Sequence, residues 1–484
     1  MLAQKSTICA HNNIAWKKVL LCCSVSGIAL FAAETAEAAC NTTGTFTRSN
    51  CFSAGAIQYY SDDTNASLTI SNETAQSVQL APDPNGSVTG ATNQTLTIDG
   101  NTTLTRSDYS AVIFDVTKAN SNVTATLAST ASITSTGGGF GAVWFKNATS
   151  GDISITNGAL VISTGQQSDA AGISAVTNGG NVYITNEASG TVTSDDRGLY
   201  ADGGSQTVKT DPYTVSITNN GMVKAGTRGA YGVNYYGNVA VTNTGSIESD
   251  TRQGIVIWSA DGGNASINNS GTVTAKDDHA LVAWSTTGDA IVTNSGTVTS
   301  SDDTTHTDTG GGHIGIQTQV ETAGNTTITN TSTGMITATA DTGIEAKALA
   351  TGNITISNAG MISARRGIYA ETADGTIGIA NTGTLSATAA TGTIYGIDYK
   401  NTGTVSGTIS NSGLMTISSA TSSTGIMIEA GSDVFADNSG TLSVSTNGRA
   451  GGIVTTGTVT GTIKNSGSLT VAGQASGAGI FVDD

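Results

Sequence analysis

A phrase of the form apolar-x-Asn-x-Gly-x-apolar recurs along most of this chain and limits what it can fold into. Clear copies span residues 217–223 and 241–247, and looser copies extend the series from Asn157 to Asn465. The series has twelve asparagines and eleven intervals, which gives a mean period of 28 residues. Repetition at a fixed period of this size is typical of a solenoid, whose repeats stack on one another. The asparagines of the clear copies are Asn219, Asn243, Asn269, Asn294, Asn358, Asn381, Asn411, Asn438 and Asn465.

Each period contains three short stretches in which Ile, Val and Thr alternate apolar with polar positions, and this alternation predicts β-strands. One stretch begins with a glycine, as in residues 254–257, and another leads into the asparagine, as in residues 353–358. Asn and Gly tolerate positive φ, so we expect them at the bends. The sequence therefore predicts an all-β fold, a right-handed single-stranded parallel β-helix with three-strand rungs of about 28 residues. Asparagines at equivalent corners are expected to stack as a ladder of amides.

Composition excludes the other architectures that a repetitive chain could adopt. The 484 residues include 62 glycines but only 3 prolines, and 11% of them are charged. Disordered chains carry more proline and charge, helical proteins need more Leu, Glu and Lys, and collagen needs glycine at every third position. The net charge of −17 argues against nucleic acid and anionic membranes as partners.

The first 38 residues have the pattern of an export signal. Lys17 and Lys18 precede an apolar run over residues 19–33, and Ala36-Glu37-Ala38 forms a small-x-small cleavage site. The run is too short for a transmembrane helix. We therefore expect residues 1–38 to be removed on export.

Two cysteines, Cys40 and Cys51, remain in the mature chain. An oxidising compartment favours a disulfide between them, and a metal-binding pair is the alternative. Residues 39–150 repeat less clearly and are interpreted as a cap with irregular rungs, including this disulfide. Residues 151–484 are interpreted as the regular β-helix.

The signal, the early cysteine pair and the Thr/Asn/Gly-rich rungs together resemble the passenger region of bacterial type V autotransporters. The phrase Asn-Ser-Gly-Thr-Val-Thr, at residues 269–274 and 294–299, carries this resemblance most clearly. It implies a β-helical passenger that crosses the outer membrane through a C-terminal β-barrel. Residues 479–484 end inside a rung and no barrel follows, so the expected partner is a barrel translocator on a longer chain or a separate protein. Two-partner secreted haemagglutinin-like proteins are a neighbouring alternative, although their Asn-Pro-Asn motifs are not matched.

No sequence pattern specifies an enzyme. The protease pattern Gly-Asp-Ser-Gly and the esterase pattern Gly-Asp-Ser-Leu are absent, and residues 151–154 match neither. His306 and His313 share a loop with Asp302 and Asp303, but a metal site needs three or four converging ligands, so a solvated loop is expected. Acidic pairs and arginines at the corner before the stretch that begins with glycine leave a lyase-like, carbohydrate-active enzyme as an alternative. We expect no catalytic residues, no metal and no cofactor.

Aromatic residues suggest a contact face. Counted from the glycine that begins a strand, positions +1 and +3 point inward and positions +2 and +4 point outward. This count places Trp258 and Trp284 outward on adjacent rungs, with Tyr200 and Tyr369 on the same face. Such a face suits contact with a carbohydrate or a protein. The alternative is that these rings cover one another or pack beneath a loop. The same count places Trp144, Tyr235 and Tyr399 inward.

The sequence therefore predicts a non-enzymatic, adhesin-like surface passenger whose stalk displays loops, at residues 202–213 and 301–313. Its partners would be host-cell, matrix or glycan surfaces, or other copies of the rod. Its expected location is the cell surface, the outer membrane or the medium, or the periplasm if a barrel is absent. The alternatives are the lyase-like enzyme and a translocation-defective autotransporter fragment.

Overall fold

The structure is a computed structural model. It describes residues 40–41, 45–49, 56–60, 65–80, 93–116, 120–137, 139–147, 150–165, 170–204, 212–302, 312–403, 405–431 and 433–483. The predicted signal at residues 1–38 lies outside these residues. Cys51 and the side chain of Cys40 also lie outside them, so the predicted disulfide stays a prediction. Much of the two predicted loops, residues 205–211 and 303–311, is likewise outside.

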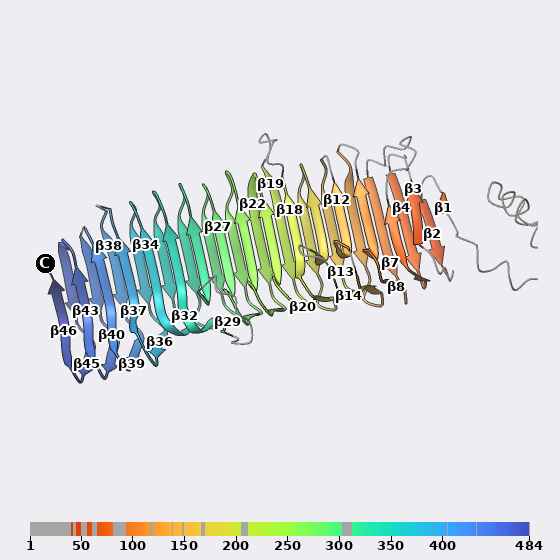
Figure 1. The fold of residues 1–484 in the computed structure, drawn as a ribbon. Coiled ribbons are helices and arrows are strands. Elements are labelled where there is room, and N and C mark those ends of the chain that lie inside the picture. Colours follow the sequence, from red (N-terminus) through yellow and green to blue (C-terminus); the bar gives the residue numbers. More distant parts are fainter. Residues whose placement is uncertain are drawn as a thin grey trace, which may run out of the picture.

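The described residues form strands and no helix, and the strands stack side by side along one axis into an elongated rod (Figure 1). They form two sheets, one of 16 strands and one of 30, in which neighbouring strands run parallel. The chain passes through three strands in turn and then begins the next rung, about 28 residues later. The predicted parallel β-helix with three-strand rungs is confirmed.

The first strand of each rung belongs to the 16-stranded sheet and, from β13 onward, ends at a repeat asparagine. These strands are β2 (Thr45–Ser49), β4 (Asn65–Ser71), β7 (Asn93–Asp99), β10 (Asn122–Leu127), β13 (Ile153–Asn157), β16 (Val182–Asn186), β19 (Tyr213–Asn219), β22 (Gly237–Asn243), β25 (Ala265–Asn269), β28 (Ala290–Asn294), β31 (Thr326–Asn330), β33 (Ile354–Asn358), β35 (Ile377–Asn381), β38 (Gly407–Asn411), β41 (Val434–Asn438) and β44 (Gly461–Asn465).

The second strand follows the asparagine corner. These strands are β5 (Thr74–Ala75), β8 (Thr103–Arg106), β11 (Ser132–Ser135), β14 (Leu160–Ser163), β17 (Thr191–Ser194), β20 (Met222–Ala225), β23 (Ser246–Ser249), β26 (Thr272–Ala275), β29 (Thr297–Ser300), β36 (Thr384–Ala389), β39 (Leu414–Ser419), β42 (Thr441–Thr446) and β45 (Ser468–Gly473). In two rungs one long strand, β32 (Met335–Ala348) or β34 (Met361–Thr372), fills both the second and third positions. These long strands join the second and third strands into the 30-stranded sheet.

The third strand begins with the glycine phrase in most rungs. These strands are β1 (Cys40–Asn41), β3 (Ala56–Tyr60), β6 (Ser77–Leu80), β9 (Val112–Val116), β12 (Gly141–Asn147), β15 (Ala171–Thr177), β18 (Arg197–Gly203), β21 (Ala230–Asn234), β24 (Ile255–Ser259), β27 (Leu281–Ser285), β30 (Ile316–Val320), β37 (Thr393–Asn401), β40 (Ser422–Ala430), β43 (Arg449–Thr456) and β46 (Ser476–Asp483).

Inward side chains from all three strands fill one continuous apolar core. In a single rung, Ile267 from β25, Val273 from β26, and Leu281 and Ala283 from β27 are all buried. Parallel pairing holds equivalent residues in register from rung to rung, so apolar positions stack on apolar positions. Burial of this core is the main favourable contribution to the stability of the rod.

The repeat asparagines form a buried ladder at the corner between the first and second strands. Asn243 Nδ2 donates to Asn269 Oδ1, and Asn269 Nδ2 donates to Asn294 Oδ1, both at 2.8 Å. Eleven such bonds of 2.6–2.8 Å run without interruption from Asn157 to Asn465. All amides donate toward the C-terminal end, so their dipoles are aligned.

The reason for glycine at this corner differs from the one expected. The corner glycines Gly245 and Gly271 do not have positive φ, and Asn72 and Asn120 are the only non-glycine residues with positive φ in the described part of the chain. A Cβ atom on Gly271 would instead clash with the carbonyl oxygen of Gly245 in the preceding rung. Close approach of stacked backbones, not a left-handed conformation, therefore requires glycine here.

Candidate functional site

The outward face of the third strands carries the predicted aromatic residues. Trp258 of β24 and Trp284 of β27 are register partners on adjacent rungs. Trp284 is 37% exposed, whereas Trp258 is half-buried and meets the ring of Tyr235 edge-on at 6.0 Å between centroids. The two indoles form a pair on the surface of the rod, which we call the tryptophan pair.

Tyr200 and Tyr369 also lie on this face but are not close to each other. They occupy the same outward position of β18 and β34, six rungs apart. At the usual spacing of parallel strands this separation is about 29 Å. The four predicted contact residues therefore share one face without forming one site.

Tyr200 belongs to a cluster of tyrosine and arginine side chains. Its ring stacks on that of Tyr231 from β21, with centroids 5.4 Å apart. The Arg197 guanidinium lies 4.7 Å from the Tyr200 centroid, and that of Arg228 lies 4.8 Å from the Tyr231 centroid. These cation–π contacts hold both rings against the sheet. Sequence analysis missed Tyr231, although it lies two residues after Gly229, the residue in the repeat-glycine position.

The predicted inward orientation is wrong for two of three aromatic residues. Trp144 is in register with Ser174 and Tyr200, both at outward positions, because Ala142 and not Gly141 occupies the repeat-glycine position. Tyr235 is half-buried and follows the last residue of β21. Tyr399 is fully buried in the core.

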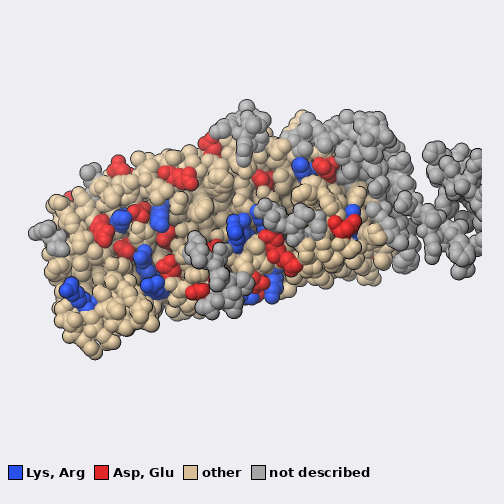
Figure 2. Space-filling view, viewed as in Figure 1, with Lys and Arg blue, Asp and Glu red and all other residues tan. Residues whose placement is uncertain are grey.

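Further along the same face, the outward residues are charged and paired with one another. Glu371 accepts a hydrogen bond from the Tyr369 hydroxyl at 2.7 Å and pairs with Lys400 at 2.9 Å. Burial opposes ionisation of Glu371, but these two partners lower the pKa of its carboxyl below the ordinary value. A second pair joins Lys347 to Glu345 at 2.8 Å. Figure 2 shows acidic and basic side chains interspersed on the visible face, with no large region of one sign.

Two carboxyl groups on this face have raised pKa values. Burial raises the pKa of Asp202 to about 6, although the Tyr200 hydroxyl and Arg197 oppose the shift. Burial likewise raises the pKa of Asp398 to about 6, opposed by Arg366, whose Nη1 lies 3.9 Å from Asp398 Oδ2. Both groups can therefore change protonation state between pH 5 and 7.

One group of side chains has the composition of a partial metal site. Ligand atoms of Asp277, Asp302 and His313 lie within 4.8 Å of one another, and Asp277 is buried. Two carboxylates and an imidazole can supply three ligands to a divalent cation. The sequence suggested only Asp302 and His313, because Asp277 comes from the preceding rung. His306 and Asp303 lie outside the described residues.

Comparison with protein-family models, with curated proteins and with solved structures found no match to the chain. Within the described residues, no helix is both long enough and apolar enough to span a membrane. The architecture defines the class of the protein as a parallel β-solenoid. Within that class, its third strands present one long outward face on which aromatic and charged side chains are held in register.

Proposed function

We propose that the chain is a non-enzymatic, adhesin-like β-helical stalk that binds a cell, matrix or glycan surface through the outward face of its third strands. The tryptophan pair is the observation that carries this proposal, since large aromatic side chains on a surface are typical of binding sites. Strand register along the rod would let several weak contacts act together.

The proposal includes export, which rests on the signal-like pattern of residues 1–38. The type V passenger assignment rests on that pattern and on the Thr/Asn/Gly-rich rungs. Antibody labelling and protease treatment of intact producing cells test it. Loss of the protein from unpermeabilised cells after protease treatment supports surface display, whereas protection until the outer membrane is opened contradicts it.

Purified protein tests the binding face directly. The W258A/W284A variant should bind immobilised cells, matrix proteins or a glycan array at least about tenfold more weakly than the unchanged protein, because truncated aromatic hot spots each cost about 2 kcal/mol or more. The matched control is Y183A/F435A, which removes two exposed aromatic side chains from the 16-stranded sheet. Equal binding by both variants would reject the tryptophan pair as the contact site.

A lyase-like, carbohydrate-active enzyme is the second candidate, favoured by the neighbouring acidic and basic groups around Tyr369. Its weakness is that Glu345 and Glu371 are already engaged by lysines. Incubation with acidic polysaccharides distinguishes the two candidates. Ultraviolet absorbance from newly formed unsaturated sugar ends, abolished by E371Q, would favour the enzyme over the stalk.

A further inference from the structure

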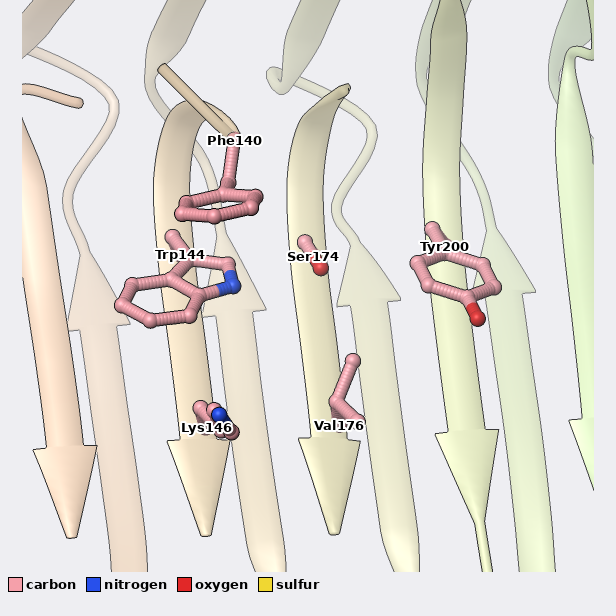
Figure 3. Close-up of a pocket in the computed structure, with 6 residues that line it drawn as sticks. All are labelled: Phe140, Trp144, Lys146, Ser174, Val176 and Tyr200. Carbon is pink, nitrogen blue, oxygen red and sulfur yellow. The ribbon is translucent and has the colours of Figure 1, made fainter. Parts of the chain in front are cut away.

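A slot opens on the outward face of the third strands beside the tyrosine–arginine cluster (Figure 3). It encloses about 360 Å³, within the range of small-ligand sites. Its lining residues come from β12, β15 and β18 and from the segment before β12: Phe140, Trp144, Lys146, Ser174, Val176 and Tyr200.

The slot exists because a small outward residue lies between two large ones. Ser174 is the register partner of both Trp144 and Tyr200, which therefore lie two rungs apart. The backbones of those two rungs are about 10 Å apart, and the serine side chain leaves the space between them open. In Figure 3 Ser174 and Val176 form the floor between the aromatic side chains.

One side of the slot offers hydrogen-bond donors and a positive charge. Phe140 is 50% exposed and stacks on Trp144, with centroids 4.8 Å apart. The indole nitrogen of Trp144 lies on the side of its ring toward Ser174, and it has no hydrogen-bond acceptor among the described residues. Lys146 Nζ lies 6.0 Å from the same ring, and no described carboxylate lies within 4.0 Å of it.

The opposite side offers acceptors. The Tyr200 hydroxyl donates to Asp202 Oδ2 at 2.9 Å, which leaves the phenol oxygen of this lining residue and the other oxygen of its neighbour Asp202 as acceptors. Asp202 is the register partner of Val176, on the floor of the slot. A ligand that fits both sides has a ring with an apolar C–H face, an anionic group for Lys146 and hydroxyl groups for Tyr200 and Asp202.

We propose that the slot binds a sugar ring that bears a carboxylate, such as a hexuronate or a sialic acid residue of a glycan. The carboxylate accepts from Lys146 and the Trp144 indole, the ring packs over Ser174 and Val176 between the aromatic side chains, and a hydroxyl donates to Asp202. Charge complementarity favours this class, because Lys146 has Asp115 of β9 as its register partner but forms no ion pair within 4.0 Å among the described residues, and a ligand carboxylate would supply one. The inference deepens the proposed binding function but uses none of the atoms of the tryptophan pair.

Calorimetric titration of the purified chain tests the proposal with three probes. These are a hexuronate tetrasaccharide, sialyllactose and neutral lactose, and the first two distinguish the sources of the carboxylate. We expect one acidic probe to bind at least tenfold more tightly than lactose. K146Q should remove that preference without weakening lactose binding, and added salt should weaken binding of the acidic probe.

S174F provides a second variant, since a phenylalanine at this outward position fills the slot. It should abolish binding of the acidic probe, whereas S266F, at an outward position of the 16-stranded sheet, should leave it unchanged. Unchanged thermal unfolding of both variants verifies the fold. Equal binding by S174F and the unchanged chain, or binding of neither acidic probe, would overturn the proposal. In that event adhesion that is sensitive to W258A/W284A would still support the proposed function.

Discussion

Removal of one amide from the buried ladder should destabilise the rod far more than removal of its exposed neighbour. The substitution N269A deletes two hydrogen bonds of 2.8 Å, one accepted from Asn243 and one donated to Asn294. It leaves the Asn243 donor and the Asn294 acceptor without their ladder partner in a fully buried corner. Each unsatisfied buried group costs about 1–3 kcal/mol, so we expect a loss of roughly 3–5 kcal/mol.

The control for this substitution is N268A, since the side chain of Asn268 is exposed on the other face of the same strand. Exposed substitutions usually change stability by less than about 0.5 kcal/mol. Urea unfolding compares the two variants, and amide hydrogen exchange locates the effect. Because repeats contact mainly their neighbours, faster exchange should be concentrated in the strands around β25 and its two stacking partners.

The amide ladder also implies a ranking of substitutions at Asn269 that a cavity alone would not produce. N269D retains the size of the side chain and can accept from Asn243, but it cannot donate to Asn294 when ionised. Burial of an uncompensated carboxylate should make N269D at least as destabilising as N269A at neutral pH, with recovery as the carboxyl becomes protonated. A cost for N269A within about 0.5 kcal/mol of that for N268A would refute the reasoning.

Two further outcomes follow from the corner and from the buried carboxyl groups. G271A should lower the free energy of unfolding in urea by several kcal/mol, or prevent folding, because the added methyl group clashes with the Gly245 carbonyl oxygen. A free energy of unfolding equal to that of the unchanged chain would contradict this account. Asp202 and Asp398 have pKa values near 6 in the fold against an ordinary 3.8, so their contribution is greatest below about pH 4 and is lost as the pH rises through 6. Unfolding at pH 4.5 and 7.5 should therefore show D202N/D398N gaining roughly 4 kcal/mol relative to the unchanged chain at the higher pH, about 2 kcal/mol from each carboxyl group, and a gain that is equal at both pH values would argue against this titration.

Much of the fold could be predicted because two periods are explicit in the sequence: the repeat of about 28 residues and the two-residue alternation along each strand. The asparagine phrase marks one corner of every regular rung, and alternation along each strand separates Ile255 and Ile257, inside, from Trp258, outside. The prediction failed where glycine did not identify the start of the third strand. Gly141 lies one residue before the repeat-glycine position and Gly232 lies three residues after it, and an error of one residue exchanges the two faces of a strand.

The slot and the acidic cluster could not be predicted for a different reason. Both depend on which residues of different rungs become neighbours, and the distance along the chain between neighbouring rungs varies. Trp144 and Ser174 are 30 residues apart, whereas Ser174 and Tyr200 are 26 apart, yet the three lie in one row across β12, β15 and β18. Asp277 joins Asp302 and His313 across a loop of similarly irregular length.

This variation in rung length explains how the fold can change its surface without losing its core. The interval between Asn186 and Asn219 is 33 residues and the next one, to Asn243, is 24, yet the amide bonds are 2.7 and 2.8 Å long. The extra residues of the longer interval therefore fall between strands β18 and β19, while the buried asparagine corner stays in register. Within a strand no such freedom exists, because loss of one residue from β24 would turn Trp258 inward and Ile257 outward. Loops and outward side chains are thus the parts that can vary, and the residues proposed to bind are outward side chains.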